Sequence, residues 1–229
     1  RRRAWAQHRA KRASNGDAND IRRTLDKTRL AMFEVRLARP RPHLDDKVLT
    51  SWNGLTIAAM AIAGRTLRND AYSTSAFRAL DFVRNKLFKD GRLLAVYAGG
   101  RARFPAYLDD YAFMLDAVLE ALQTNWRTED LHFAISLAEA LLAHFEDRAS
   151  GGFYFTADDH ETLIARNKDL QDASVPSGNA MAAAALLRLG KLTGRTDYLE
   201  SAGRTLTASR SVIEQSPLAA GQMLIALDL

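Results

Sequence analysis

The sequence predicts an all-α fold in which repeated helical hairpins form part of an α/α toroid around a polar pocket. Two features of the pattern lead to this prediction. Apolar helices alternate with amphipathic helices, and the links that follow the amphipathic helices are long and rich in polar residues. The composition agrees, since a chain of 229 residues with 47% apolar and 26% charged residues can form a sizeable core.

Helix pairs recur along the chain. The expected pairs are 52–67 with 75–88, 111–122 with 129–145, and 180–192 with 198–213, and a further apolar stretch covers 223–227. The first helix of each pair is apolar nearly all round and must be buried, whereas the second carries one apolar stripe and meets water. We therefore expect three inner helices, three outer helices and the start of a fourth hairpin. Periodicity also allows an ordinary helix bundle or an open solenoid.

The links from outer to inner helices are the second feature. They cover residues 39–51, 90–109 and 150–177. The second link is expected to form a β-hairpin around Gly99-Gly100, and the third is expected to turn at 158–160. Because all three links hold the same place in the repeat, they should lie on one face of the array, where we expect the functional site.

Carboxylates are concentrated in these links, and the predicted catalytic residues are Asp110, Asp109, Asp46 and Asp172. Each aspartate directly before a helix has a structural explanation, because aspartate favours helix N-caps and first turns. A cap needs one carboxylate, however, and a second is available as a general acid or base. Paired carboxylates from separate loops are also what glycoside hydrolysis requires.

Other polar and aromatic residues in the links resemble the lining of a sugar pocket, in which rings stack on sugars while amides and charged groups bind hydroxyls or anions. The predicted ligand-binding residues are Asp45, Lys47, Trp52, Asn53, Tyr111, Arg166, Lys168, Asp169, Ser177 and Asn179. Ser177 is expected to cap a helix rather than act as a nucleophile, because no nucleophile-elbow motif surrounds it. His43 and His160 are the histidines of these links, and an epimerase would need such a proton-shuttling base.

Composition excludes several classes of site. The sequence has no cysteine, so these residues hold no disulfide, zinc–thiolate or redox dithiol site. No metal or cofactor is expected, and no apolar run is long enough to cross a membrane. A cytoplasmic location is predicted. Residues 1–20 are expected to form a basic arm or the end of a preceding helix, but the arm is too short and too poor in aromatic residues to indicate nucleic-acid binding.

Several motifs resemble one known family. They are the segments at 41–55, 107–112, 151–156, 166–169, 172–173 and 176–179. This pattern is similar to the thioredoxin domain-containing proteins of the spermatogenesis-associated type, and the resemblance covers roughly 25–229. It implies an (α/α)6 barrel related to six-hairpin glycosidases and N-acylglucosamine 2-epimerases, with a thioredoxin-like domain upstream that 21–229 lacks.

Two functions follow as hypotheses. In the first, the toroid binds a sugar-like ligand and acts as a glycoside hydrolase or a sugar epimerase. In the second, it is a non-catalytic scaffold that binds a ligand or partner for the thioredoxin-like domain. Because fewer than six hairpins are present, the open edges should expose apolar surface. We expect further hairpins of the same protein, or a second copy, to cover them.

Overall fold

The computed structural model describes residues 17–161 and 164–229. The chain divides into two units, Arg1–Asp45 and Asp46–Leu229. Most of the expected basic arm, 1–16, lies outside the described residues. In the first unit, helix α2 (Ala18–Leu37) begins after Asp17, whose carboxylate accepts a hydrogen bond from the backbone N–H of Asn19. None of the twenty residues of α2 is buried.

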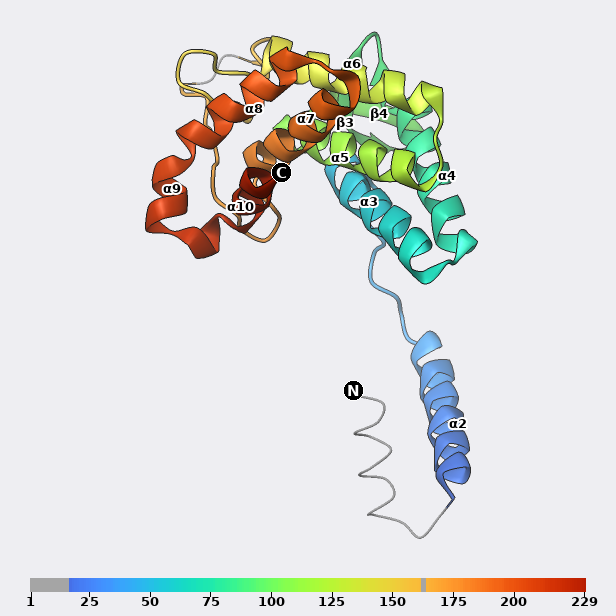
Figure 1. The fold of residues 1–229 in the computed structure, drawn as a ribbon. Coiled ribbons are helices and arrows are strands. Elements are labelled where there is room, and N and C mark those ends of the chain that lie inside the picture. The colour runs from blue at the N-terminus through green and yellow to red at the C-terminus, as the bar shows by residue number, and fades with distance from the viewer. Residues whose placement is uncertain (1–16, 162–163) are drawn as a thin grey trace. The chain divides into compact units, whose positions relative to one another are not determined.

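The second unit consists of helical hairpins. Its helices are α3 (Thr50–Leu67), α4 (Asp70–Lys86), α5 (Leu108–Thr124), α6 (Thr128–His144), α7 (Gly178–Thr193), α8 (Thr196–Ala208), α9 (Arg210–Gln215), the short 3-10 helix η1 (Pro217–Ala219) and α10 (Gly221–Asp228). Helices α3, α5, α7 and α10 pack against one another in that order, and α4, α6 and α8 cover them (Figure 1). The predicted alternation of inner and outer helices is therefore confirmed.

The expected outer helix at 198–213 is two helices. The first, α8, ends at Ala208, and α9 begins at Arg210. Ser209 lies between them, and its hydroxyl donates a hydrogen bond to the carbonyl of Thr205. A hydroxyl that competes for a backbone carbonyl in this way tends to bend or interrupt a helix.

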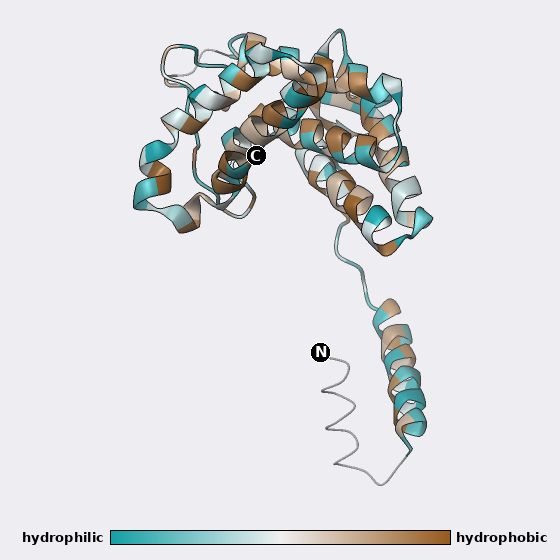
Figure 2. Ribbon diagram, viewed as in Figure 1, coloured by the Kyte–Doolittle hydropathy of each residue, from teal (hydrophilic) through white to brown (hydrophobic). Residues whose placement is uncertain are grey.

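The core is centred on α5, which has buried residues on every side. Its neighbour α3 comes very close, because a side-chain carbon added at Gly54 would lie 2.8 Å from the backbone of Phe113. On the other side α7 presents a run of buried alanines, Ala182–Ala185. Small residues on both neighbours thus let the inner helices pack closely around the large side chains of α5. The hydropathy colouring of Figure 2 shows apolar residues along these inner helices.

In the described part of the chain, four short strands accompany the helices: β1 (Val48–Leu49), β2 (Phe88–Lys89), β3 (Arg92–Ala98) and β4 (Arg101–Pro105). Strand β3 pairs antiparallel with each of the others. The hairpin expected around Gly99-Gly100 is confirmed, with Ala98 opposite Arg101 and both glycines at positive φ. In the link at 150–177, the described residues form no strand, and a single bridge joins Phe153 to Glu146.

A charged network crosses the inner helices, and the sequence did not lead us to expect it. Arg188 of α7 donates to Asp116 and to Glu120 of α5, at 2.6 Å each. Glu120 also accepts from Arg65 of α3 at 2.7 Å. The network joins three successive inner helices through partly buried ion pairs.

We expect Arg188→Met to lower the free energy of unfolding by about 2–3 kcal/mol, because it leaves the partly buried Asp116 carboxylate without its cation. Burial already raises the pKa of Asp116, and Arg188 opposes that rise. Without Arg188 the pKa of Asp116 should rise further. The loss of unfolding free energy should therefore grow as the pH increases and Asp116 becomes charged. Urea denaturation at two pH values measures both effects. The control is Arg210→Met, which removes the exposed Arg210–Glu214 pair. It should lower the free energy of unfolding by less than about 0.5 kcal/mol.

Within the described residues, no helix has both the length and the apolar character that crossing a membrane requires.

Candidate functional site

The four inner helices begin on one face of the second unit, which we call the N-terminal face. The links between hairpins are tied to one another there. The hydroxyl of Thr50 donates to the carbonyl of Leu94 at 2.6 Å, and the backbone N–H of Leu108 donates to the carbonyl of Phe155 at 3.0 Å. The third link is held by the N–H of Asp172, which donates to the carbonyl of Ala219 at 2.7 Å.

Asp110 joins α3 to α5 on this face. One carboxylate oxygen accepts from the N–H of Ser51 at 2.8 Å, and the other accepts from the N–H of Tyr107 at 2.9 Å. Burial raises the pKa of Asp110 to about 6, although the backbone hydrogen bonds oppose this rise. Both oxygens satisfy helix N-termini, so the structure gives Asp110 a capping role across two helices.

Asp172 joins α7 to α10 in the same way. Its Oδ1 accepts from the N–H of Ser177 at 2.9 Å, and its Oδ2 accepts from the N–H of Gln222 at 2.8 Å. Two of the three gaps between neighbouring inner helices therefore hold a carboxylate that is saturated by backbone N–H groups.

Asp109 lies in the remaining gap, between α5 and α7. A side-chain carbon added at Gly178 would collide with its Oδ1, so the carboxylate lies directly against the first residue of α7. Within the described part of the chain, this carboxylate accepts no hydrogen bond. Burial, followed by the charges of Asp110 and Asp169, raises the pKa of Asp109 to about 6. Asp109 is thus a half-buried carboxylate that helix capping does not use.

The other predicted residues of the first link lie at the surface. Asp45, Asp46 and Lys47 are exposed, and so is Trp52, whose side chain is 64% exposed on the first turn of α3. Asn53 donates from its side-chain amide to the carbonyl of Leu49 at 2.8 Å. Trp52 directly follows Ser51, whose N–H donates to Asp110, and its role as a ring that stacks on a ligand stays a prediction.

Tyr111 requires a correction. Its ring is fully buried, and its hydroxyl accepts from the N–H of Leu93 at 2.8 Å and from Arg92 at 3.3 Å. The residue lies one turn into α5, on the side that faces β3. It therefore anchors the strand to the helix, and its ring is not available to a ligand on the surface.

Arg166 and Lys168 hold the third link together. Arg166 donates to the carbonyls of Thr156 and His144, and its guanidinium lies 4.2 Å from the ring centre of Tyr154. Lys168 donates to Asp147 at 2.7 Å, and this ion pair is the main cause that lowers the pKa of Asp147. Both cations therefore have structural partners within the third link, and the binding of an anionic ligand by either one stays a prediction.

Ser177 and Asn179 are buried at the start of α7. The hydroxyl of Ser177 donates to the carbonyl of Asp169, which also accepts from the side-chain amide of Asn179. Asn179 further exchanges two hydrogen bonds with the backbone of Phe153. These bonds hold the backbone of Asp169, whose side chain is exposed. The charge of Asp169 contributes to the raised pKa of Asp109.

An aromatic cluster that sequence reasoning missed lies just before α5, where Tyr107 is two residues ahead of Asp109 in the chain. The rings of Tyr107 and Phe155 stack with their centres 5.0 Å apart, and the ring of His160 meets Tyr107 edge-on at 5.3 Å. The Nε2 of His160 is buried and has no hydrogen-bond partner among the described residues. The sequence shows these aromatic residues, but it does not show that their rings are in contact, because that contact depends on how the second and third links pack together.

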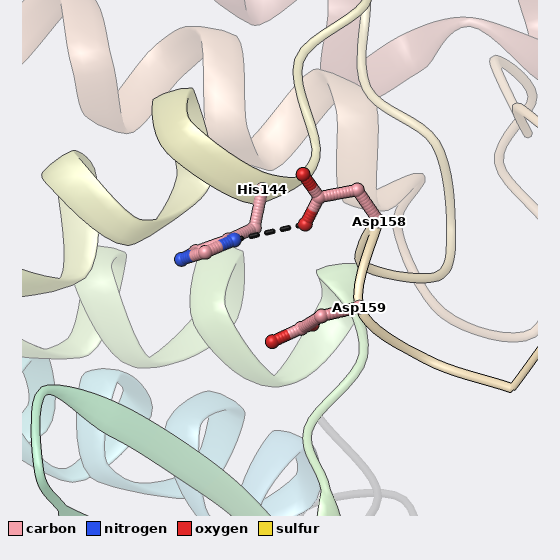
Figure 3. A group of neighbouring side chains, drawn as sticks. All are labelled: His144, Asp158 and Asp159. Carbon is pink, nitrogen blue, oxygen red and sulfur yellow. Dashed lines mark hydrogen bonds and ion pairs between the residues drawn. The ribbon is translucent and has the colours of Figure 1, made fainter.

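Among residues 17–161 and 164–229, one group of side chains has ligand atoms close enough for a metal ion: His144, Asp158 and Asp159 (Figure 3). The Nδ1 of His144 lies 2.9 Å from Asp158, and Asp159 forms a two-pronged ion pair with Arg92. A cation would have to compete with the guanidinium of Arg92. The group is better explained as an ion-paired contact between the second and third links.

Comparison with known proteins identifies the chain. No family model matches it. It is 32% identical to spermatogenesis-associated protein 20 of Rattus norvegicus over 208 residues, which is 86% of this chain, and 31% identical to the Homo sapiens protein over 93% of this chain. The chain belongs to the spermatogenesis-associated protein 20 family. It spans about a quarter of the length of these relatives, at 26% and 28%.

Solved structures show the fold. A cellobiose 2-epimerase from Spirochaeta thermophila matches with a TM-score of 0.59 and 17% identity, over 73% of this chain and 44% of that one. An unsaturated glucuronyl hydrolase from Bacillus sp. matches with a TM-score of 0.58 and 16% identity, over 75% and 49%. The second unit therefore has the fold of sugar epimerases and glycoside hydrolases, and corresponds to roughly half of their (α/α)6 toroid.

Proposed function

We propose that this chain forms part of a carbohydrate-active enzyme, with its sugar site on the N-terminal face and Asp109 as the general acid–base. One observation carries the proposal. Of the three aspartates that fill gaps between inner helices, Asp110 and Asp172 are saturated by backbone N–H groups, whereas Asp109 is not. A half-buried carboxylate whose pKa is raised and whose oxygens accept no capping hydrogen bond is typical of functional sites.

The electrostatics suit this role. A general acid works best when its pKa lies near the working pH, and enzymes raise carboxyl pKa values by burial and by neighbouring negative charge. Asp109 has both, because it is half-buried and lies near Asp110 and Asp169. Asp169 is the second carboxylate of the proposed pair, since it is exposed and its charge contributes to the raised pKa of Asp109. Ser177 and Asn179 hold its backbone carbonyl, and its carboxylate accepts from the N–H of Gln171.

Sugar binding has candidate contacts around the pair. Trp52 offers an exposed ring, and Tyr107 with Phe155 offers a stacked aromatic surface whose residues are each 37% exposed. Rings of this kind pack against the apolar faces of sugars while carboxylates accept hydrogen bonds from hydroxyls. Glycoside hydrolysis and epimerisation both remain compatible with this arrangement.

The remainder of the ring needs further protein. The inner helices at the two edges expose apolar side chains, such as Ile62 and Leu67 on α3 and Ile225 and Leu227 on α10. We propose that further hairpins of the longer protein, or of a second copy, cover these edges. The thioredoxin-like domain implied by the sequence motifs would then adjoin this assembly.

A panel of sugars tests the function. Cellobiose, D-mannose and D-glucuronate should each be examined for saturable stabilisation in a thermal melt and for conversion by chromatography. At least one is expected to bind and to be converted, with the product separating hydrolysis from epimerisation. If none shifts the melting temperature or changes chemically, the proposal fails and the non-catalytic scaffold becomes the better account.

A further inference from the structure

Phe104 is held in an unusual backbone conformation. Its φ is 61°, in the left-handed region, and it directly precedes Pro105. Bulky residues rarely adopt positive φ, and a following proline restricts the backbone further. The ring is nevertheless 63% exposed, so burial of the side chain does not compensate for the strain in the backbone.

Packing does not account for this conformation. Among the described residues, Phe104 takes part in no aromatic pair and does not belong to the hydrophobic core, whereas its neighbour Ala102 packs against that core. A residue chosen for stability at such a position would be glycine or asparagine, which tolerate positive φ. Strain that stability does not explain is typical of functional sites.

Strand pairing and hydrogen bonds connect Phe104 to the N-terminal face. The next residue, Pro105, pairs with Leu94, and the carbonyl of Leu94 accepts from the hydroxyl of Thr50. Ser51, which follows Thr50, donates to Asp110. Strand β4 then runs directly through Ala106 and Tyr107 into the first turn of α5. A short series of contacts thus connects Phe104 to Asp110, the chain neighbour of Asp109, and Trp52 directly follows Ser51 in this series.

We propose that Phe104 is a specificity-determining residue of the sugar site, whose ring stacks on the apolar C–H face of a pyranose bound next to Asp109. The left-handed backbone keeps the ring outward and prevents it from folding down beside Ala102. This assignment rests on the proposed function, because it requires that the N-terminal face bind a sugar.

The test compares Phe104→Asn with Phe104→Trp. Asparagine accepts the left-handed backbone and cannot stack, whereas tryptophan keeps an aromatic ring. The control is Trp126→Asn, which removes another exposed ring, 53% exposed, at the opposite end of α5. Each protein is titrated with the sugar of the panel that binds the wild type, by calorimetry, and its melting temperature is measured.

We expect Phe104→Asn to bind the sugar about tenfold more weakly while its melting temperature rises by about 2–4 °C. Phe104→Trp should bind within about twofold of the wild type, as should Trp126→Asn. Unchanged affinity together with a lower melting temperature in Phe104→Asn would overturn the inference, because Phe104 would then be structural.

Failure of the inference differs from failure of the proposed function. If the wild type binds a sugar and Phe104→Asn binds it equally well, the assignment of Phe104 is wrong while the sugar site stands. If the wild type binds none of the three sugars, both are wrong.

Discussion

Asp109→Asn is expected to lower the turnover of the sugar that the protein converts by about 10²–10⁴-fold, the usual contribution of a general acid–base. Binding of that sugar should change little, because asparagine keeps the shape of the side chain and can still hydrogen-bond hydroxyls. Steady-state kinetics with the product assay measures the first effect, and calorimetric titration measures the second.

The same substitution should stabilise the fold. Burial and neighbouring charge raise the pKa of Asp109 from 3.8 to about 6. A carboxyl whose pKa is raised in the folded state has its stabilising effect below its unfolded pKa and loses it as the pH rises through the folded pKa. Above pH 6 the charged carboxylate therefore destabilises the fold. Its removal should raise the free energy of unfolding by about 1–2 kcal/mol at pH 7.5, allowing for partial solvent access, and should have little effect near pH 3.5.

Asp110→Asn is the matched comparison. Asp110 accepts from two backbone N–H groups, and the amide nitrogen of asparagine cannot accept from either of them. Asparagine at position 110 should therefore lower the free energy of unfolding by about 1–3 kcal/mol near pH 4. The loss should be smaller at pH 7.5, where the substitution also removes a carboxylate whose pKa burial raises to about 6. A gain of stability with loss of turnover at Asp109, against a loss of stability at Asp110, would separate the functional carboxylate from the structural one. If Asp109→Asn also lowers stability and leaves turnover intact, Asp109 is a structural residue.

Asp130→Ala should have the largest effect on stability, a loss of about 3–5 kcal/mol. Its carboxylate is fully buried between two arginines, with Arg84 at 2.6 Å and Arg127 at 2.6 Å and 3.0 Å. Without it, two partly buried guanidinium groups face each other across the contact between α4 and α6. Thermal melts should show a fall of about 10 °C or more.

Asp81→Ala provides the control for this network. Asp81 pairs with the same two arginines, but its side chain is 38% exposed. Water replaces an exposed carboxylate readily, so the loss should stay below about 1 kcal/mol. If both variants lose the same free energy of unfolding, burial of the Asp130 carboxylate does not explain its contribution to stability.

The alternation of apolar and amphipathic helices predicted the fold, because the spacing of apolar residues along each helix determines how much of that helix is buried. Apolar inner helices and striped outer helices are visible in the sequence, and so is the hairpin at Gly99-Gly100. The interruption at Ser209 was not predicted, because it depends on one hydroxyl that bonds the carbonyl of Thr205.

The site was predicted less completely, because its chemistry depends on contacts between hairpins. The sequence indicated that the aspartates lie at helix N-termini, but not which helix each one caps. Asp109 and Asp110 are adjacent aspartates with different hydrogen bonding. Asp110 accepts from the N–H of Ser51, whereas the carboxylate of Asp109 lies against Gly178. Asp130 was missed because it resembles an ordinary first-turn acid until Arg84 of α4 is placed beside it.

The most direct test of the account is the ionisation of Asp109 itself. Its carboxyl carbon can be followed by ¹³C NMR as the pH is varied, with Asp109→Asn to assign the signal, in the presence and absence of the bound sugar. We expect a midpoint near pH 6 in the free protein and a clear shift of that midpoint on binding. A midpoint at about 4, the ordinary value for aspartate, and no response to cellobiose, D-mannose or D-glucuronate would contradict the account.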